Sequence, residues 1–344
     1  MKFGPVDASK AIGAVLAHSV RVATGRLRKG LVLTGVHLAQ LQEAGIKTVT
    51  VARLDPEDIH ENDAAARLAA ALVPDPDAAG LRLAAPFTGR VNMLARGPGV
   101  AVLDVAALQR FNSVHPMITI ATVPPHQQMA DGGMVATIKI IAYAVPGGAV
   151  AQAAKAAQGA LRLAGPVLRS ADLVVTNIPG GAPNDKGIRA ISARVRALGM
   201  ELSEIFEVAH EEAALAGTLA QTRGDMVLIL TGSATSDPED VGPSALRRAG
   251  GRVTRFGMPV DPGNLLFLGE MGADSATRPV IGLPGCARSP ALNGADWVLS
   301  RVACGIAVTG DDIAGMGVGG LLKEIPTRPQ PRSQPRSRPR DTPS

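Results

Sequence analysis

The sequence predicts an α/β protein. Its second half is expected to form a three-layer, doubly wound, mostly parallel sheet domain, preceded by a mixed α+β, β-rich N-terminal region. From Ser170 onward, short apolar runs rich in β-branched residues alternate with amphipathic stretches of roughly 10–15 residues, the pattern of βαβ units. The 39 glycines and 26 prolines also favour many tight turns over a helical bundle.

The first half of the chain, 1–148, mixes short helices and strands. Residues 80–145 are apolar or alternating between Gly and Pro breaks, which predicts a β-rich stretch. Before it we expect a helix at 7–18, a short helix closed by Gly45, a strand at Ile46–Val51, and a helix over 62–73 that begins at Asn62 or Asp63. The alanine-rich segment 149–165 is expected to form a connecting helix, with the connection ending at 168.

The second half, 169–325, alternates strands and helices without a repeat of fixed period. Each apolar run is bounded by turn-forming residues, and each helical pattern closes on Gly or begins after Pro or an acidic residue. We expect strands at 172–176, 202–208, 226–230, 252–256, 265–269 and 279–283, and helices at 188–199, 211–224, 243–251 and 289–302.

Ligands of parallel α/β sheets bind where the carboxyl ends of the strands meet. Three loops are expected there, 177–187, 231–242 and 284–290, and each is rich in Gly, hydroxyl or acidic residues. The sequence therefore predicts a pocket walled by these loops.

The loop at 231–240 reads TGSATSDPED and combines two kinds of chemistry. Its glycine, hydroxyls and backbone N–H groups suit an anion. Its acids repel a bare phosphate, so they are expected to face Mg²⁺ or a heterocycle rich in N–H donors. A ligand with both a phosphate and such a ring would match the whole loop; a solvated acidic surface loop is the alternative.

The basic excess of the chain comes from its end. The net charge is +5, and the last nineteen residues, 326–344, hold five arginines and one aspartate. Pro/Arg/Ser sequence of this kind cannot bury a core, so we expect a disordered tail. What precedes it has no basic excess, and eight aromatic residues are too few for a base-stacking surface. Nucleic-acid binding is therefore not expected.

We expect a cytoplasmic protein without membrane contact. Cys286 and Cys304 form neither a disulfide framework nor a zinc motif. Pro5 and Asp7 interrupt the N-terminal stretch in which a signal peptide needs apolar residues. No run approaches the ~18 apolar residues of a membrane-spanning helix.

The three loop sequences resemble motifs of one family. TGSATSDPED resembles the TGGxSxGxxD motif of the molybdopterin-binding domain shared by molybdopterin adenylyltransferases and molybdopterin molybdenumtransferases. Thr231, Gly232 and Asp240 match this motif, whereas Ser233, Thr235 and Asp237 are substitutions. VDPGNLLFLG resembles KPGKPxxFG with Asn264 at a lysine position, and IGLPGCARSP resembles GLPGNPVS. The resemblance covers about 170–305.

The resemblance implies a protein of molybdenum cofactor biosynthesis that binds molybdopterin or adenylyl-molybdopterin, with Mg²⁺ and, where metal is inserted, molybdate. Asp240 and Asp185 are the implied catalytic residues, with Asp240 also the metal ligand. The implied cofactor-binding residues are Thr176, Thr231, Gly232, Ser233, Thr235, Gly263, Asn264, Pro284, Gly285 and Ser289.

The departures from the family pattern keep other functions open. Asn177 stands where an STGDE-type acidic region is expected, and the DxSxMDGYA motif of full molybdenumtransferases is missing from the first half. A non-catalytic carrier that serves a molybdenum hydroxylase is the alternative to an enzyme, and a nucleotide-binding regulatory module is a third. Partners are then other cofactor-assembly proteins or the hydroxylase; the oligomeric state stays open, a homo-oligomer included.

Two further motifs do not support a site. GMGVGG at 315–320 fits GxGxxG, but only LLKEI follows it before the Pro-rich tail, so no βαβ unit is available for a dinucleotide. HEEAA at 210–214 lacks the second histidine of HExxH, and its acids are expected to begin a helix.

Overall fold

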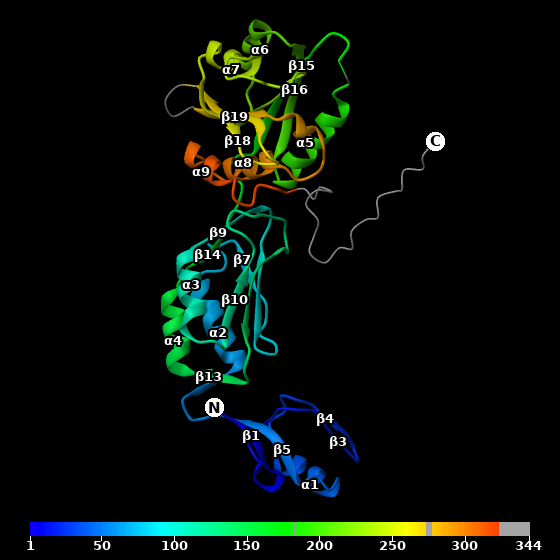
Figure 1. Cartoon of the computed structure of the whole chain (residues 1–344), viewed down its shortest axis with the longest axis vertical. Coiled ribbons are helices and arrows are strands. Elements are labelled where there is room, and N and C mark those ends of the chain that lie inside the picture. Colours follow the sequence, from blue (N-terminus) through cyan, green and yellow to red (C-terminus); the bar gives the residue numbers. More distant parts are fainter. Residues whose placement is uncertain (182, 273–276, 323–344) are drawn as a thin grey trace, which may run out of the picture. The chain divides into compact units, whose positions relative to one another are not determined.

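The computed structural model describes residues 1–181, 183–272 and 277–322, and the tail expected at 326–344 lies outside them. The chain divides into two compact units (Figure 1): unit 1 is Met1–Gly165, and unit 2 begins at Pro166. Within the described ranges, no helix is both long enough and apolar enough to cross a membrane.

The first part of unit 1 has a small hydrophobic core of its own, which includes Leu16, Leu33, Leu41 and Val51. Its elements are a sheet of β1 (Lys2–Asp7), β5 (Thr48–Arg53) and β2 (Val15–Leu16), a hairpin of β3 (Val20–Val22) and β4 (Gly25–Leu27), the 3₁₀ turn η1 (Ala8–Lys10), and α1 (Gly35–Glu43). The short helix before Gly45 is confirmed.

The helix expected at 7–18 is wrong. Only Ala8–Lys10 form a 3₁₀ turn, and Val15–Leu16 pair with β5 as a strand. Gly13 has φ +74°, a left-handed conformation that ends any right-handed helix there. The apolar residues of this segment are therefore buried by strand pairing.

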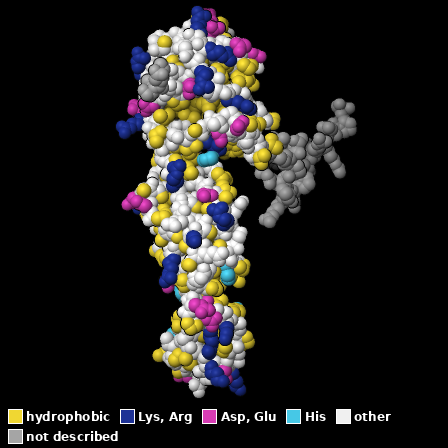
Figure 2. Space-filling view, turned by 90° about the vertical axis from the view of Figure 1, so that its left-hand side faces the viewer, with side chains coloured by type: hydrophobic (Ala, Val, Ile, Leu, Met, Phe, Trp, Pro, Cys, Tyr) yellow, Lys and Arg dark blue, Asp and Glu magenta, His cyan; other side chains and the backbone are white. Residues whose placement is uncertain are grey.

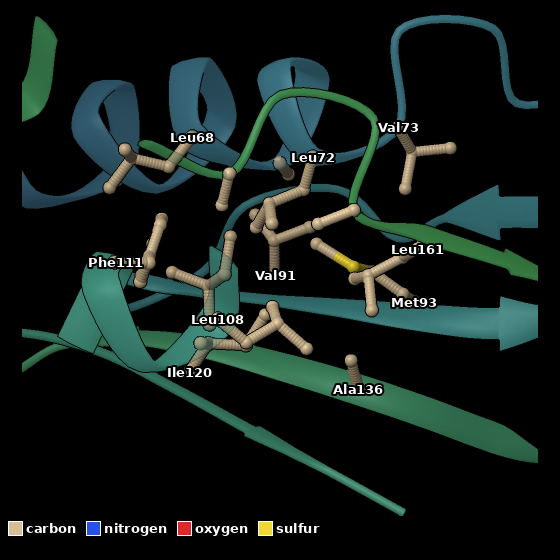
Figure 3. Packing of buried hydrophobic residues seen from close by; sticks show 14 of the residues in the cluster. Leu68, Leu72, Val73, Val91, Met93, Leu108, Phe111, Ile120, Ala136 and Leu161 are labelled. Carbon is tan, nitrogen blue, oxygen red and sulfur yellow. The ribbon is translucent and has the colours of Figure 1, made fainter. Parts of the chain in front are cut away.

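The rest of unit 1 packs helices against short sheets (Figure 3). Leu68 and Leu72 of α2 (Glu61–Leu72), Phe111 of α3 (Val105–Val114) and Met93 of β8 (Arg90–Ala95) meet in one buried cluster. The other elements are β7 (Leu81–Leu83), β9 (Gly99–Leu103), β10 (Ile118–Thr122), β11 (Gln128–Met129), β12 (Met134–Ile140), the pair β6 (Asp58–His60) and β13 (Ala144–Pro146), α4 (Gly147–Ala156) and β14 (Leu161–Ala164).

Two details of this region differ from expectation. The helix α3 interrupts the stretch expected to be β-rich, and Asp104 caps it by accepting the N–H of Ala107 at 2.9 Å. The connecting helix expected over 149–168 is shorter, because α4 ends at Ala156 and residues 161–164 pair with β9 as a strand. Val150 and Ala153 of α4 are buried in the unit 1 core, so this helix belongs to unit 1 and is not a linker.

Unit 2 is built on a six-stranded sheet with the order β16-β15-β17-β20-β19-β18. Four strands are parallel, and β19 runs antiparallel to both β20 and β18, so the expected mostly parallel sheet is confirmed. The strands are β15 (Ser170–Asn177), β16 (Glu201–Ala209), β17 (Met226–Leu230), β18 (Arg252–Met258), β19 (Asn264–Met271) and β20 (Arg278–Leu283).

Helices cover both faces of this sheet. Successive residues of a strand point to opposite faces, so each strand packs against helices on both sides. Leu228 of β17 packs with side chains of α5 (Asp185–Ala197) and α8 (Gly294–Ala303). Its neighbours Val227 and Ile229 pack with α6 (Glu212–Leu219) and α7 (Val241–Arg248). A run of five apolar residues is thus explained by burial on two faces. The last helix described is α9 (Gly310–Gly315).

The helix expected from Ser289 begins later. Gly285–Arg288 form a 3₁₀ turn, η3, and α8 begins at Gly294. Asn293 accepts the N–H of Ala295 at 3.0 Å, and Asp296 accepts the N–H of Asn293 at 2.8 Å, which forms a capping box. The intervening residues remain a loop at the sheet edge.

Charged side chains are interspersed on the face shown in Figure 2: Lys and Arg do not gather there into one basic area. That face therefore offers no electrostatic footprint of the kind that nucleic acids need.

The packing of Phe267 yields a test of the unit 2 core. Phe267 is paired with Gly282 on the neighbouring strand, and a Cβ at position 282 would lie 1.9 Å from Cε1 of its ring. We expect Gly282→Ala to lower the free energy of unfolding by about 1–3 kcal/mol or more, because the buried ring must move. Urea unfolding followed by fluorescence of Trp297, the single tryptophan and a residue of unit 2, measures this.

Gly217→Ala is the matched control. Position 217 lies in α6, and no atom lies within 4 Å of a Cβ placed there. Removing the flexible glycine should raise stability by about 0.5–1 kcal/mol. Equal destabilisation by the two substitutions would contradict the packing argument.

Candidate functional site

The carboxyl ends of β15, β17 and β20 lie at one edge of the unit 2 sheet, as the parallel pairing requires. The loops after them border a cavity of about 630 Å³, a volume typical of small-molecule sites. Its lining residues are Thr176, Asn177, Ile178, Gly180, Gly181, Pro183, Asn184, Asp185, Lys186, Gly187, Glu207, Gly232 and Arg288. All three loops that the sequence singled out contribute to it.

Gly232 brings the loop after β17 into direct contact with the end of β15. Its N–H donates to Oγ1 of Thr176 at 2.8 Å. A Cβ at position 232 would lie 2.6 Å from the carbonyl oxygen of Thr176. Only glycine allows this approach, which explains the residue type at this position.

The hydroxyl of Thr176 has two partners within the protein. It accepts the N–H of Gly232, and its oxygen lies 2.8 Å from Nδ1 of His210. A hydroxyl can donate one hydrogen bond and accept two, so this contact is compatible with either neutral tautomer of His210. Thr176 therefore joins the end of β15 to the loop after β17 and to His210.

A chain of hydrogen bonds runs along the cavity wall from a carboxylate to a guanidinium. Asn177 donates its Nδ2 hydrogen to Oε2 of Glu207 at 3.0 Å, and Asn184 donates to Oδ1 of Asn177. Arg288 donates from Nη1 to Oδ1 of Asn184 at 2.7 Å. Opposite charges thus stand at the two ends of two linked amides.

Arg288 joins all three loops. Besides its bond to Asn184, it donates from Nη2 to the carbonyl of Thr231 at 2.9 Å. Both acceptors are neutral, the side chain is half-buried, and this burial lowers the pKa of Arg288. Among the residues that the structure describes, none forms an ion pair with its guanidinium.

The amino end of α5 opens into the same cavity. Asn184 is its N-cap residue, but its side chain makes no capping hydrogen bond, because Oδ1 accepts from Arg288 instead. A Cβ at Gly187 would lie 3.2 Å from both Cγ and Nη1 of Arg288. The glycine therefore lets the arginine side chain lie over the first turn of the helix.

Some of the expected site residues line the cavity, and others lie outside its lining. Thr176, Gly232 and Asp185 line the cavity. Thr231 and Thr235 are buried beside it, where Oγ1 of Thr231 donates to the carbonyl of Ser233 at 2.6 Å and lies 3.3 Å from Oγ1 of Thr235. These hydroxyls hold the loop to itself, and Ser233 is exposed.

Asp240 has a structural role that the sequence interpretation missed. It is the N-cap of α7: its Oδ1 accepts the N–H of Val241 at 2.7 Å, and its Oδ2 accepts the N–H of Ser236 at 2.9 Å. It does not line the cavity. Asp240 as a metal ligand stays a prediction.

The remaining expected residues lie at the same edge but outside the cavity lining: Gly263, Asn264, Pro284, Gly285 and Ser289. Asn264 accepts the N–H of Leu266 at 3.1 Å, which shapes the start of β19. Ser289 accepts the N–H of Ala291 at 3.3 Å within its loop.

Three charged lining residues were not foreseen: Glu207, Lys186 and Arg288. Glu207 comes from β16, whose position beside β15 the sequence does not reveal. Lys186 and Arg288 lie in two of the loops that were expected to form the pocket. A cationic residue in a loop expected to bind an anion is the sequence feature that would have identified them. Among the described residues, no group of three or more His, Cys, Asp or Glu side chains could hold a metal ion.

Comparison with known families agrees with this geometry. Residues 168–302 match a family described as a probable molybdopterin binding domain, and residues 5–53 match a domain of unknown function, DUF8806. No curated protein matches the chain. The first match extends from the start of β15 through nearly all of α8 and includes every residue that lines the cavity. Residues 168–302 of this chain are therefore a member of the molybdopterin-binding domain family.

Proposed function

We propose that unit 2 is a three-layer α/β domain that binds molybdopterin, or its adenylylated form, in the cavity at the carboxyl edge of its sheet, and that it acts in molybdenum cofactor biosynthesis. The observation that carries the proposal is the separation of charge along the cavity wall. A guanidinium and an open helix amino end stand at one end of the hydrogen-bonded chain, and the carboxylate of Glu207 stands at the other.

The positive end suits the phosphate of the ligand. Backbone N–H groups at a helix start bind phosphate oxygens, and guanidinium binds them with charge-assisted hydrogen bonds. The N–H of Gly232 and the hydroxyl of Thr231, which the motif suggested for this role, already have acceptors within the protein. We therefore place the phosphate near the first turn of α5, with the exposed Ser233 as a further hydrogen-bond donor.

The negative end suits the pterin ring. Glu207 is exposed and uses one carboxylate oxygen to accept from Asn177, so its other oxygen can accept ring N–H and amino hydrogens. Four of the lining residues, Gly180, Gly181, Gly187 and Gly232, have no side chain, so part of the wall is backbone, against which a flat ring can lie. A ligand with a phosphate and a donor-rich ring fits the two ends.

Two functions are compatible with such binding. An enzyme would cleave adenylyl-molybdopterin and insert molybdenum from molybdate, with Mg²⁺ on the phosphates. Asp185 in the cavity lining and Asp240 at the start of α7 are the carboxylates proposed for that chemistry. The second candidate is a carrier that hands the cofactor to a molybdenum hydroxylase. The engagement of both Asp240 oxygens by backbone N–H groups favours the carrier, because those bonds compete with a metal ion.

Purification from a host that makes molybdopterin tests the proposal. Mass spectrometry and pterin fluorescence should find the pterin bound at one equivalent per chain. Hydrolysis of added adenylyl-molybdopterin that depends on Mg²⁺ would identify the enzyme, and binding without turnover would identify the carrier. Binding of ATP or GTP with no pterin would overturn both.

Glu207→Gln tests the ring end of the cavity. The substitution keeps the size of the side chain and removes its charge, so the hydrogen bonds to ring donors lose their charge assistance. We expect the affinity for molybdopterin to fall by about 10- to 100-fold, measured by isothermal titration. Glu204→Gln is the control: it lies on the same strand, is exposed, and does not line the cavity. Equal losses would show that only the net charge of the unit matters.

Asp240→Asn separates ligand binding from helix capping. Asparagine can still cap α7, but its amide nitrogen cannot accept the second backbone N–H, so we expect unit 2 to stay folded and to lose about 1 kcal/mol of stability. An ionised carboxylate accepts up to about four hydrogen bonds and Asp240 uses two, so we propose that it also contacts the ligand and expect a tenfold or greater loss of affinity.

The exposed Asp237 provides the control for this measurement. Asp237→Asn should change the affinity by less than about threefold, as expected for a screened surface charge. If Asp240→Asn also stays below threefold, Asp240 serves only as the cap of α7. A loss seen only with Mg²⁺ present would assign Asp240 to the metal.

A further inference from the structure

We propose that Arg288 and the first turn of α5 bind the terminal phosphate of the ligand directly, as a phosphate monoester dianion and without a bridging Mg²⁺. The inference deepens the proposed function and rests on it: it names the form of the ligand that the cavity selects and the residue that selects it.

Arg288 forms no ion pair with a carboxylate among the described residues, and Asp185, the acid in the first turn of α5, makes no hydrogen bond to it. Arg194, which contacts the same loop, shows what compensation looks like: its Nε donates to Oδ1 of Asp296 at 2.7 Å, and its Nη groups donate to four backbone carbonyls. Arg288 uses only two of its five N–H groups, both toward neutral oxygens. Removing a cation from water without a counter-charge is unfavourable, so the site favours an anion.

The guanidinium of Arg288 is held beside the amino end of α5. Gly187, in the first turn of α5, leaves the space through which the Arg288 side chain passes. Helix amino ends carry partial positive charge and favour anions, so a guanidinium beside one is repelled unless an anion lies between them. The side chain of Asn184 could cap the helix but accepts from Arg288 instead, which leaves the first N–H groups of α5 for a ligand.

A terminal phosphate monoester fits this site better than a phosphate that is linked to AMP. A terminal monoester carries about two negative charges at neutral pH, and its oxygens can accept from guanidinium and helix N–H groups together. In adenylyl-molybdopterin that phosphate is joined to AMP through a phosphoanhydride bond, so it carries less charge and has fewer free oxygens. Lys186, also in the lining, adds a second cation for a dianion. The cavity should therefore prefer molybdopterin over its adenylylated form.

Arg288 carries a positive charge at a position where the family motif has an uncharged residue. Asn264 occupies a lysine position of the resembled KPGKPxxFG motif and is neutral. Arg288 occupies the valine position of the resembled GLPGNPVS motif. The positive charge of the site thus comes from the loop after β20, and it reaches the cavity through the contacts with Asn184 and Thr231.

Isothermal titration of the full chain with molybdopterin, with adenylyl-molybdopterin and with inorganic phosphate, each in EDTA and in Mg²⁺, tests the inference. Wild type should bind molybdopterin equally in both buffers and more tightly than the adenylylated form. Arg288→Gln should lower the affinity for molybdopterin by about 10- to 100-fold and remove the preference between the two pterins.

Two further variants serve as controls. Arg288→Lys keeps the charge but not the planar fork, so its loss should be intermediate. Arg189→Gln removes an exposed positive charge from α5. Arg189 does not line the cavity, so the substitution should change the affinity by less than about threefold. Trp297 fluorescence shows whether each variant is folded; if Arg288→Gln is not, Arg288→Lys and the EDTA comparison on wild type decide.

The outcomes separate this inference from the proposed function. Equal binding of molybdopterin by wild type and Arg288→Gln, or binding that requires Mg²⁺, overturns the inference and leaves the function standing. If wild type binds inorganic phosphate through Arg288 but no pterin, the function fails and the anion site stands.

Discussion

The site depends on the guanidinium of Arg194. This buried side chain extends from α5 and donates to the carbonyls of Ala287, Ser289 and Ala291 and to the carboxylate of Asp296. A planar group with five donors can satisfy several oxygens at once, which suits a loop that has little regular structure of its own. Asp296 also closes the capping box of α8, so one ion pair ties two helices to the loop that carries Arg288.

Glycines in and beside the sheet are as important to the site as the charged side chains. Gly232 lets two loops meet at Thr176, Gly187 admits Arg288 over α5, and Gly282 accepts the ring of Phe267 in the sheet. In each place a Cβ would lie within about 3 Å of a neighbouring atom. Gly232 and Gly187 thus let the loops around the cavity lie close together, and most of the side chains that line it are polar or charged.

The division of charge within the cavity gives the site its chemistry. Arg288 and the start of α5 are electropositive, whereas Glu207 is negative, and the amides of Asn177 and Asn184 connect them. Linked amides polarise one another, so a ligand bound at one end can affect the hydrogen bonds at the other. A phosphate attached to a donor-rich ring matches both ends, which explains why the acidic and anion-binding features of the loops occur together.

The sequence by itself determined the strands and most of the helices of unit 2, and the edge at which its loops meet, because apolar periodicity and turn residues report local structure directly. It did not determine that α8 begins at Gly294 or that α9 forms. It also pointed to Thr176, Gly232 and Asp185, which line the cavity. It did not determine that β16 pairs with β15, which brings Glu207 to the site, nor that residues 15–16 and 161–164 are strands. Strand pairing joins residues far apart in the chain, and short strands are stable only through it. The direction of Arg288 and the capping role of Asp240 were likewise decided by tertiary structure, since each depends on which hydrogen-bonding groups the folded loops place within reach.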